Sequence, residues 1–129
     1  MKKIKKTEKE WRASLSELAF QVTRNSATEK PFTEHGFPNS EGTYQCICCG
    51  AELFSSKTKF NSGSGWPSFY DIINSQAVTK KQDDSYSMIR TEVSCSRCDA
   101  HLGHVFSDGP APTGLRYCIN GVALNFSKK

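Results

Sequence analysis

Apolar and polar positions follow a helical period near the N-terminus of the chain. Between positions 7 and about 25, apolar residues recur at spacings of three and four and form a single stripe. Thr7, with Glu10 three positions later, has the pattern of a capping box. We therefore expect one amphipathic helix over residues 7–25, packed against the protein through its apolar stripe. That stripe comprises Trp11, Leu15, Leu18, Ala19 and Val22.

Short strands are expected after Gly42, because segments rich in β-branched and aromatic residues alternate with turns. Residues 26–41 are rich in Ser, Thr, Pro, Gly and Asn, which favours an irregular connection. The sequence thus predicts one mainly β, antiparallel domain over residues 1–129, with the helix and connection in 1–41 and the β core in 42–126. The expected strands are GTYQC, AELF, AVTK, SYSMIRTEV, HVF, LRYCIN and VALNF.

Composition and charge narrow the class of protein. The chain has 129 residues, 36% of them hydrophobic, which is typical of one folded domain. Its net charge of +4 comes largely from lysines at the two ends, so nucleic-acid binding is not indicated. No apolar run follows the opening MKKIKK, and no stretch of about 18 apolar residues could cross a membrane. We expect a cytoplasmic protein, in which cysteine serves as metal ligand or reactive thiol.

Two C-x2-C pairs indicate a metal site. Cys46 with Cys49, and Cys95 with Cys98, can each present two thiolates from one tight turn. Two such turns facing each other make the tetrahedral sulfur cage that zinc prefers. Four thiolates leave no open coordination position, so the expected role of the zinc is structural. The alternative is four buried apolar cysteines, but packing gives no reason for the paired spacing.

The segment LRYCIN carries a further thiol. If this segment is a strand, Arg116, Cys118 and Asn120 share one face, and the residues between them form an apolar core face. A cation, a thiol and an amide in a row are typical of a reactive site, because a neighbouring cation favours the nucleophilic thiolate. Asn120 can orient a substrate or a water molecule through its amide.

Two other segments offer candidate site residues. In HLGHVF, His104 shares a face with Phe106 and can act as an acid or base beside a thiol. His101 follows the second cysteine pair closely, and we interpret it as a structural residue that bonds loop backbone. In NSGSGWPSF, Trp66 followed by Pro67 provides a rigid aromatic surface that suits a methyl or thioether group. A core tryptophan on a turn explains the same pattern.

Together these motifs closely resemble the B-type methionine sulfoxide reductases, which reduce the R epimer of methionine sulfoxide. The matching stretches cover most of residues 42–126. They are CICCGAELF, TKFNSGSGWPSFY, CSRCDAHLGHVFSDGPAPTGLRYCIN and VALNF. The resemblance implies two antiparallel sheets in an open, barrel-like arrangement (β-tent, Mss4-like), which agrees with the strand pattern.

The resemblance also implies a site and a reaction. The implied residues are structural zinc ligands at Cys46, Cys49, Cys95 and Cys98, the nucleophile Cys118, His104, Arg116 and Asn120 around the sulfoxide oxygen, and Trp66 with Phe106 against the substrate's methyl group. The implied chemistry oxidises the nucleophile to a sulfenic acid, which a second thiol converts to a disulfide that thioredoxin reduces. The expected partners are oxidised proteins or peptides and thioredoxin or another thiol reductant, and the expected state is a monomer.

One position departs from the common pattern of these reductases. Many of them carry the resolving cysteine where this chain has Ser64, and a hydroxyl cannot resolve a sulfenic acid. Cys48 is the remaining internal thiol, either a resolving residue or a small apolar filler. Direct reduction of the Cys118 sulfenic acid by an external thiol is the favoured alternative.

Two other classes of protein fit less well. A zinc-ribbon-like module that binds protein or nucleic acid would explain the cysteine pairs and the mild positive charge. It leaves the face formed by Arg116, Cys118 and Asn120 unexplained. A zinc-dependent hydrolase or deaminase needs a metal-bound water, which four thiolate ligands exclude.

Overall fold

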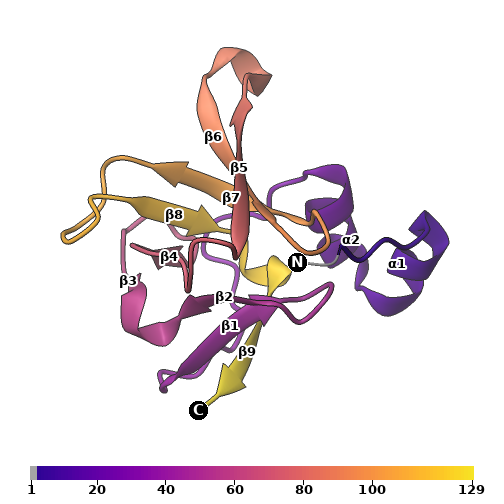
Figure 1. Ribbon diagram of the computed structural model, residues 1–129, viewed down its shortest axis with the longest axis horizontal. Coiled ribbons are helices and arrows are strands. Elements are labelled where there is room, and N and C mark those ends of the chain that lie inside the picture. The colour runs from indigo at the N-terminus through magenta and orange to yellow at the C-terminus, as the bar shows by residue number, and fades with distance from the viewer. Residues whose placement is uncertain (1–2) are drawn as a thin grey trace.

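Two antiparallel sheets and two short helices make up the fold in the computed structural model, which describes residues 3–129 (Figure 1). The strands are β1 (Gly42–Cys46), β2 (Glu52–Ser55), β3 (Lys59–Phe60), β4 (Ser68–Phe69), β5 (Val78–Asp83), β6 (Arg90–Cys95), β7 (His101–Phe106), β8 (Arg116–Ile119) and β9 (Leu124–Lys128). The smaller sheet has the order β2-β1-β9, and the larger has the order β3-β4-β8-β7-β6-β5. Neither sheet closes on itself, so the predicted open, tent-like arrangement is confirmed.

The N-terminal segment forms two helices, α1 (Glu8–Ser14) and α2 (Glu17–Asn25), so the prediction of one continuous helix was wrong. The break lies at Leu15, whose backbone is extended (φ −119°, ψ 151°). Ser16 then caps a new helix, because its hydroxyl accepts a hydrogen bond from the Ala19 amide at 3.1 Å. After this break the phase of the stripe changes, since Leu18 is 44% exposed while Phe20 is 1% exposed.

The capping box at the start of α1 is confirmed. The Glu10 amide donates to the Thr7 hydroxyl at 3.2 Å, and the Thr7 amide donates to the Glu10 carboxylate at 2.9 Å. The bond from the Thr7 amide, with a smaller effect of the Thr7 side chain, lowers the pKa of Glu10, because it stabilises the charged carboxylate. Neither helix in the described part of the chain has the length and apolar character needed to span a membrane.

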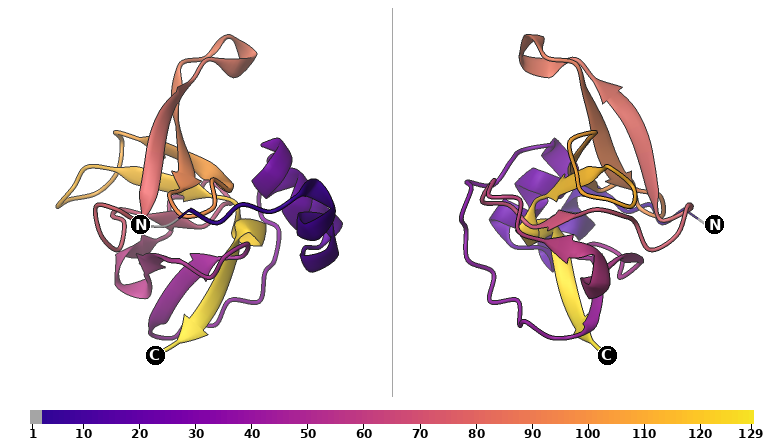
Figure 2. Two further views of the ribbon diagram at one scale, coloured as in Figure 1. Left: turned by 45° about the vertical axis from the view of Figure 1, so that its right-hand side comes forward. Right: turned by 90° about the vertical axis from the view of Figure 1, so that its left-hand side faces the viewer.

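The strand predictions failed at one segment and missed two others. Residues 85–89 were expected to be extended, but Ser85–Ser87 form a 3-10 turn, and Ile89 is 81% exposed. Asp83 pairs with Arg90, so the residues between them must turn the β5–β6 hairpin, whatever their propensity. This hairpin projects from the body of the protein (Figure 2). Strands β3 and β4 have two residues each, which is too short for a periodic signal.

Aromatic side chains fill the space between the two sheets. Phe54 of β2 stacks on Phe69 of β4, with ring centroids 4.3 Å apart, and Tyr44 of β1 meets Phe69 edge-on at 5.1 Å. Tyr117 of β8 packs against Phe54 at 5.7 Å. Because Tyr117 points into this core, the next residue of β8 points to the opposite face of the larger sheet. The core therefore fixes which way Cys118 faces.

Candidate active site and metal centre

The two cysteine pairs come together as predicted. The Sγ atoms of Cys46, Cys49, Cys95 and Cys98 all lie within 4.8 Å of one another. The Cys46–Cys98 and Cys49–Cys95 sulfur distances are both 3.6 Å. A tetrahedral site with Zn–S bonds of about 2.3 Å requires sulfurs about 3.8 Å apart, so the four thiols fit such an ion. These four cysteines form the candidate metal centre of the protein.

Matching tight turns present the four sulfurs. In the first turn the Gly50 amide bonds the Cys46 carbonyl at 2.8 Å, and in the second the Asp99 amide bonds the Cys95 carbonyl at 2.8 Å. Gly50 and Asp99 both have positive φ, 78° and 63°, which lets each turn close. The first turn ends β1 and the second ends β6, so the metal centre joins the smaller sheet to the larger one.

Cys118 lies on a central strand of the larger sheet. It pairs with His104 of β7 on one side and with Ser68 of β4 on the other. The predicted alternation along β8 is confirmed, because Tyr117 and Ile119 are 1% and 0% exposed while Cys118 is only partly buried. The strand therefore offers the thiol on the face away from the aromatic core.

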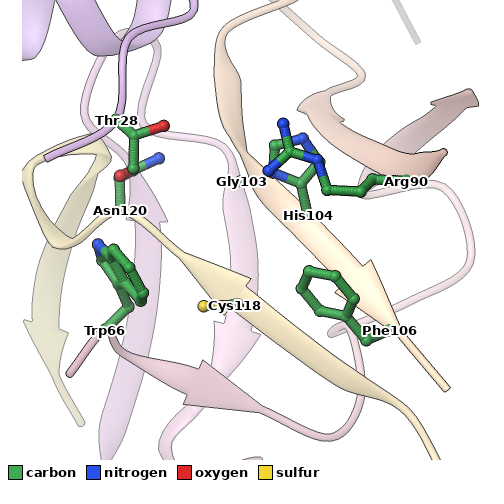
Figure 3. A pocket seen from close by; sticks show the side chains of 8 residues that line it. All are labelled: Thr28, Trp66, Arg90, Gly103, His104, Phe106, Cys118 and Asn120. Atoms are coloured by element: carbon green, nitrogen blue, oxygen red, sulfur yellow. The ribbon is translucent and has the colours of Figure 1, made fainter. Parts of the chain in front are cut away.

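A small pocket of about 100 Å³ opens over this thiol. Its lining residues are Thr28, Trp66, Arg90, Gly103, His104, Phe106, Cys118 and Asn120. Figure 3 shows the Cys118 sulfur between the Trp66 indole and the Phe106 ring, with His104 on β7 two residues before Phe106. Five of the predicted site residues thus line one pocket. Two aromatic rings beside a sulfur suit a thioether or methyl group.

Burial raises the pKa of the Cys118 thiol. The Ser64 hydroxyl, 3.8 Å from the sulfur, and the Arg116 guanidinium act in the opposite direction and lower that pKa. The net direction is upward, so the favourable effect expected from the neighbouring cation is present but burial outweighs it. A group in the pocket that stabilises the anion would favour the thiolate, which is the nucleophilic form.

Arg116 does not line the pocket, although it shares the face of Cys118. Its Nε donates to Asp108 Oδ1 at 2.9 Å, and Nη2 donates to Oδ2 at 3.3 Å. The guanidinium also lies over the Phe106 ring, 4.4 Å from its centroid. Because this bidentate pair raises the pKa of Arg116, the guanidinium keeps its charge and its place beside the site.

Each of the two histidines of β7 is paired with a carboxylate. His104 Nε2 lies 2.8 Å from Asp83 Oδ2, and His101 Nδ1 lies 2.6 Å from Glu92 Oε2. Burial lowers the pKa of His101, which is 4% exposed, so it favours the neutral ring. The partner of His101 is thus a carboxylate rather than the expected loop backbone. Sequence reasoning missed Asp83, because it lies in the β5–β6 hairpin, far along the chain from His104.

Asn120 is held by protein groups at both ends of its amide. Its Oδ1 accepts from the Glu29 amide at 3.0 Å, and its Nδ2 donates to the Leu102 carbonyl at 3.0 Å. The Trp66 indole is also held, because its Nε1 donates to the Glu29 carbonyl at 3.0 Å. Glu29 was not among the predicted site residues, since a single acid in a polar connection carries no sequence signal.

Cys48 does not line the pocket over Cys118. Its thiol lies in hydrogen-bonding range of Cys46 and Cys98 at the metal centre and of Thr23 on α2. None of the four clustered cysteines lines the pocket. The second cysteine pair lies in the turn between β6 and β7, and His101, Leu102 and Gly103 of β7 separate that turn from His104.

Comparison with known proteins agrees with this geometry. Residues 15–128 match the SelR domain. The chain is 60% identical to the peptide methionine sulfoxide reductase MsrB of Pseudomonas fluorescens, over 97% of this chain and 96% of that protein. It is 58% identical to the MsrB of Methanosarcina barkeri, over 97% of this chain and 89% of that protein. The chain belongs to the B-type methionine sulfoxide reductases.

Membership of this family makes the chain an oxidoreductase and accounts for most of the site. The four clustered cysteines form a possible metal site, which is consistent with a structural metal in this family.

Proposed function

We propose that the chain reduces the R epimer of methionine sulfoxide in oxidised proteins or peptides, with Cys118 as the nucleophile. The observation that carries this proposal is the position of the Cys118 sulfur between Trp66 and Phe106 in a pocket of about 100 Å³. A pocket of this size accepts the end of a methionine side chain, and its aromatic walls suit the methyl group.

The first step transfers oxygen from the substrate to the enzyme. The thiolate of Cys118 attacks the sulfoxide sulfur while the oxygen takes up a proton, for which His104 is the donor, directly or through water. This attack forms an S–S bond between Cys118 and the substrate sulfur. The protonated oxygen then passes to the Cys118 sulfur, so that the S–O bond of the substrate and the transient S–S bond break and an S–O bond forms at Cys118. The substrate sulfur is thereby reduced by two electrons to methionine, and Cys118 becomes a sulfenic acid.

The second step restores the thiol. A thiol of an external reductant, such as thioredoxin, condenses with the Cys118 sulfenic acid, which releases water and forms a mixed disulfide. A second thiol of the reductant then displaces Cys118. The position of Cys48 supports this external route, because Cys48 lies at the metal centre. The Ala100 carbonyl accepts a bond from Cys95 of that centre, and Ala100 lies four residues before His104, the residue that pairs with Cys118. Four residues of a strand span roughly 13 Å.

The metal in this proposal is one structural zinc. Cys46, Cys49, Cys95 and Cys98 would hold it, and the all-thiolate donor set is the one that zinc takes in closed structural sites. The ion supplies a cross-link between the two sheets and takes no part in the reaction. We expect the enzyme to act as a monomer in the cytosol, where thiol reductants keep its cysteines reduced.

Reduction of both epimers of a blocked methionine sulfoxide, driven by dithiothreitol, tests the proposal. We expect wild type to consume only the R epimer and Cys118→Ser to lose at least about 10³-fold of kcat/KM. Cys48→Ser is the matched control, because it removes a thiol of the same protein that lies outside the pocket. Equal turnover by wild type and Cys118→Ser would rule out the proposed nucleophile.

A further inference from the structure

Glu29 is a buried acid in the irregular connection between α2 and β1. Its side chain is 0% exposed, although burial of an unpaired carboxylate is costly. Both oxygens are satisfied. Oε1 accepts from the Val122 amide at 2.9 Å, and Oε2 lies 2.9 Å from His35 Nε2. The carboxylate thus fastens the connection to the 3-10 turn Gly121–Ala123, which directly follows β8.

The backbone of the same residue bonds two side chains of the pocket. The Glu29 amide donates to Asn120 Oδ1 at 3.0 Å, and the Glu29 carbonyl accepts from Trp66 Nε1 at 3.0 Å. Trp66 and Asn120 stand one above the other beside Cys118 in Figure 3, with Thr28, the residue before Glu29, above them. One residue of the connection therefore touches both side chains on this wall of the pocket.

We propose that Glu29 is a positioning residue, whose anchored carboxylate holds its own backbone where it sets the Trp66 indole and the Asn120 amide against Cys118. The inference rests on the proposed function, in which the substrate lies against Trp66 in the pocket that Asn120 also lines. Without the anchor, the two backbone bonds would be carried by an irregular segment free to shift, and a shift of about 1 Å in a substrate wall costs about 10²-fold in rate.

The contacts of His35 indicate that the side chain at position 29 must have a defined length. A Cβ atom at Gly121 would lie 2.1 Å from the His35 ring, so the ring packs directly on the backbone of the 3-10 turn. The other side of His35 stacks on Phe37, with ring centroids 5.5 Å apart. The His35 ring therefore cannot move toward the backbone of residue 29 to meet a shorter acidic side chain. The Glu29 side chain has to span the whole distance between its backbone and these two donors.

The charge of Glu29 does not explain its presence near the thiol. Its negative charge raises the pKa of Cys118, which disfavours the thiolate that attacks the substrate. An acid kept at this position for its electrostatic effect would thus work against the reaction. The property of Glu29 that matters for the proposal is the length of its side chain, together with its two acceptor oxygens.

Three variants separate reach from charge. Glu29→Gln keeps the length, accepts from the Val122 amide through its oxygen and donates to a neutral His35 ring through its nitrogen. Glu29→Asp keeps the charge but is one methylene shorter. Glu29→Ala removes the anchor altogether. Glu34→Gln is the matched control, because Glu34 is an exposed acid in the same connection.

Two measurements read the outcome on the full-length protein. The first is kcat/KM for the blocked sulfoxide with dithiothreitol. The second is acrylamide quenching of tryptophan fluorescence, which reports mainly on Trp66, since Trp11 is 4% exposed. We expect Glu29→Ala and Glu29→Asp to lose about 10²-fold in kcat/KM and to show stronger quenching. The kcat/KM of Glu29→Gln should stay within about fivefold of wild type, because this variant alters only one hydrogen bond.

Other results would overturn the proposal. If Glu29→Asp kept its activity while Glu29→Gln lost it, the charge would be the relevant property. If all variants matched Glu34→Gln, Glu29 would have no role. If activity fell only in proportion to the fraction unfolded, with quenching of the folded protein unchanged, the role would be in stability alone. Because quenching is measured without substrate, these outcomes are distinct from a failure of Cys118→Ser to abolish turnover.

Discussion

The Ser64 hydroxyl lies 3.8 Å from the Cys118 sulfur. Ser64 occupies the tip of a loop in which the hydroxyls of Ser62, Ser64 and Ser68 form a chain of hydrogen bonds, 2.8 Å and 2.7 Å long. A serine therefore stands at the position from which a thiol could reach the sulfenic acid of Cys118. The chain keeps the geometry of an internal resolving step but lacks the sulfur for it.

Ser64→Cys should restore an internal resolving thiol. After one equivalent of sulfoxide without reductant, we expect this variant to form a disulfide between position 64 and Cys118. Wild type should instead be trapped by dimedone as a sulfenic acid. Intact-mass spectrometry distinguishes the two products. Ser62→Cys is the control, because Ser62 bonds Ser64 rather than Cys118. Equal dimedone labelling of wild type and Ser64→Cys would contradict the prediction.

Arg116→Met should make the Cys118 thiol less acidic. Arg116 lowers the pKa of Cys118 against the larger opposing effect of burial, so its removal raises that pKa further. A smaller fraction of thiolate is then present at neutral pH, and the profile of iodoacetamide alkylation against pH moves to higher pH. Arg12→Met is the control, because Arg12 pairs with Glu17 at 3.4 Å on the exposed helices. A profile that stays in place would show that Arg116 acts only through packing on Phe106.

His104→Ala should lower kcat/KM by about 10² to 10⁴-fold, the usual effect of losing a general acid. We expect the alkylation profile to stay in place, because the proposed role of His104 is to protonate the sulfoxide oxygen, while burial, Ser64 and Arg116 set the pKa of Cys118. Asp83→Asn should give a smaller loss, since it weakens the 2.8 Å contact that orients the His104 ring. If His104→Ala slowed alkylation as much as turnover, the histidine would act on the thiol and not on the sulfoxide oxygen.

Removal of the metal should unfold the β core. A structural zinc contributes about 10–16 kcal/mol in small domains, which equals or exceeds the usual net stability of a protein. We expect metal analysis to give about one zinc per chain, and a chelator or Cys95→Ser to abolish the β signal in circular dichroism. Cys48→Ser should keep its metal. A metal-free protein with unchanged thermal unfolding would exclude a structural role for the ion.

Cys48→Ser should turn over normally with thioredoxin as the sole reductant. The Cys48 thiol lies beside Cys46 and Cys98, and a disulfide requires its two sulfurs to approach to about 2 Å, which the path along β7 does not allow without rearrangement. Steady-state rates with thioredoxin and with dithiothreitol test this. A sharp loss with thioredoxin alone, with dithiothreitol activity intact, would identify Cys48 as the resolving thiol.

Local patterns were enough for much of the site. Two C-x2-C pairs identified the metal ligands, because a metal turn needs its two sulfurs close together in sequence. Alternation along LRYCIN placed the thiol on the face opposite the core, because side chains of a strand alternate whatever its neighbours are. Where the predicted element depended on a partner elsewhere in the fold, the local pattern gave a wrong prediction. The strand expected at residues 85–89 has none, and the helical stripe breaks at Leu15, where Ser16 starts a second helix.

By itself, the sequence determined the mainly β class and pointed to the four clustered cysteines and the proposed nucleophile, since each depends on residue type and short spacing. Only the tertiary structure decided what surrounds Cys118. It brought Asp83 to His104 from 21 positions away and Glu29 to Asn120 from 91 positions away. It also set Ser64 rather than Cys48 beside the thiol. Pairings across such distances depend on how the sheets register and pack, which no local pattern of residues encodes.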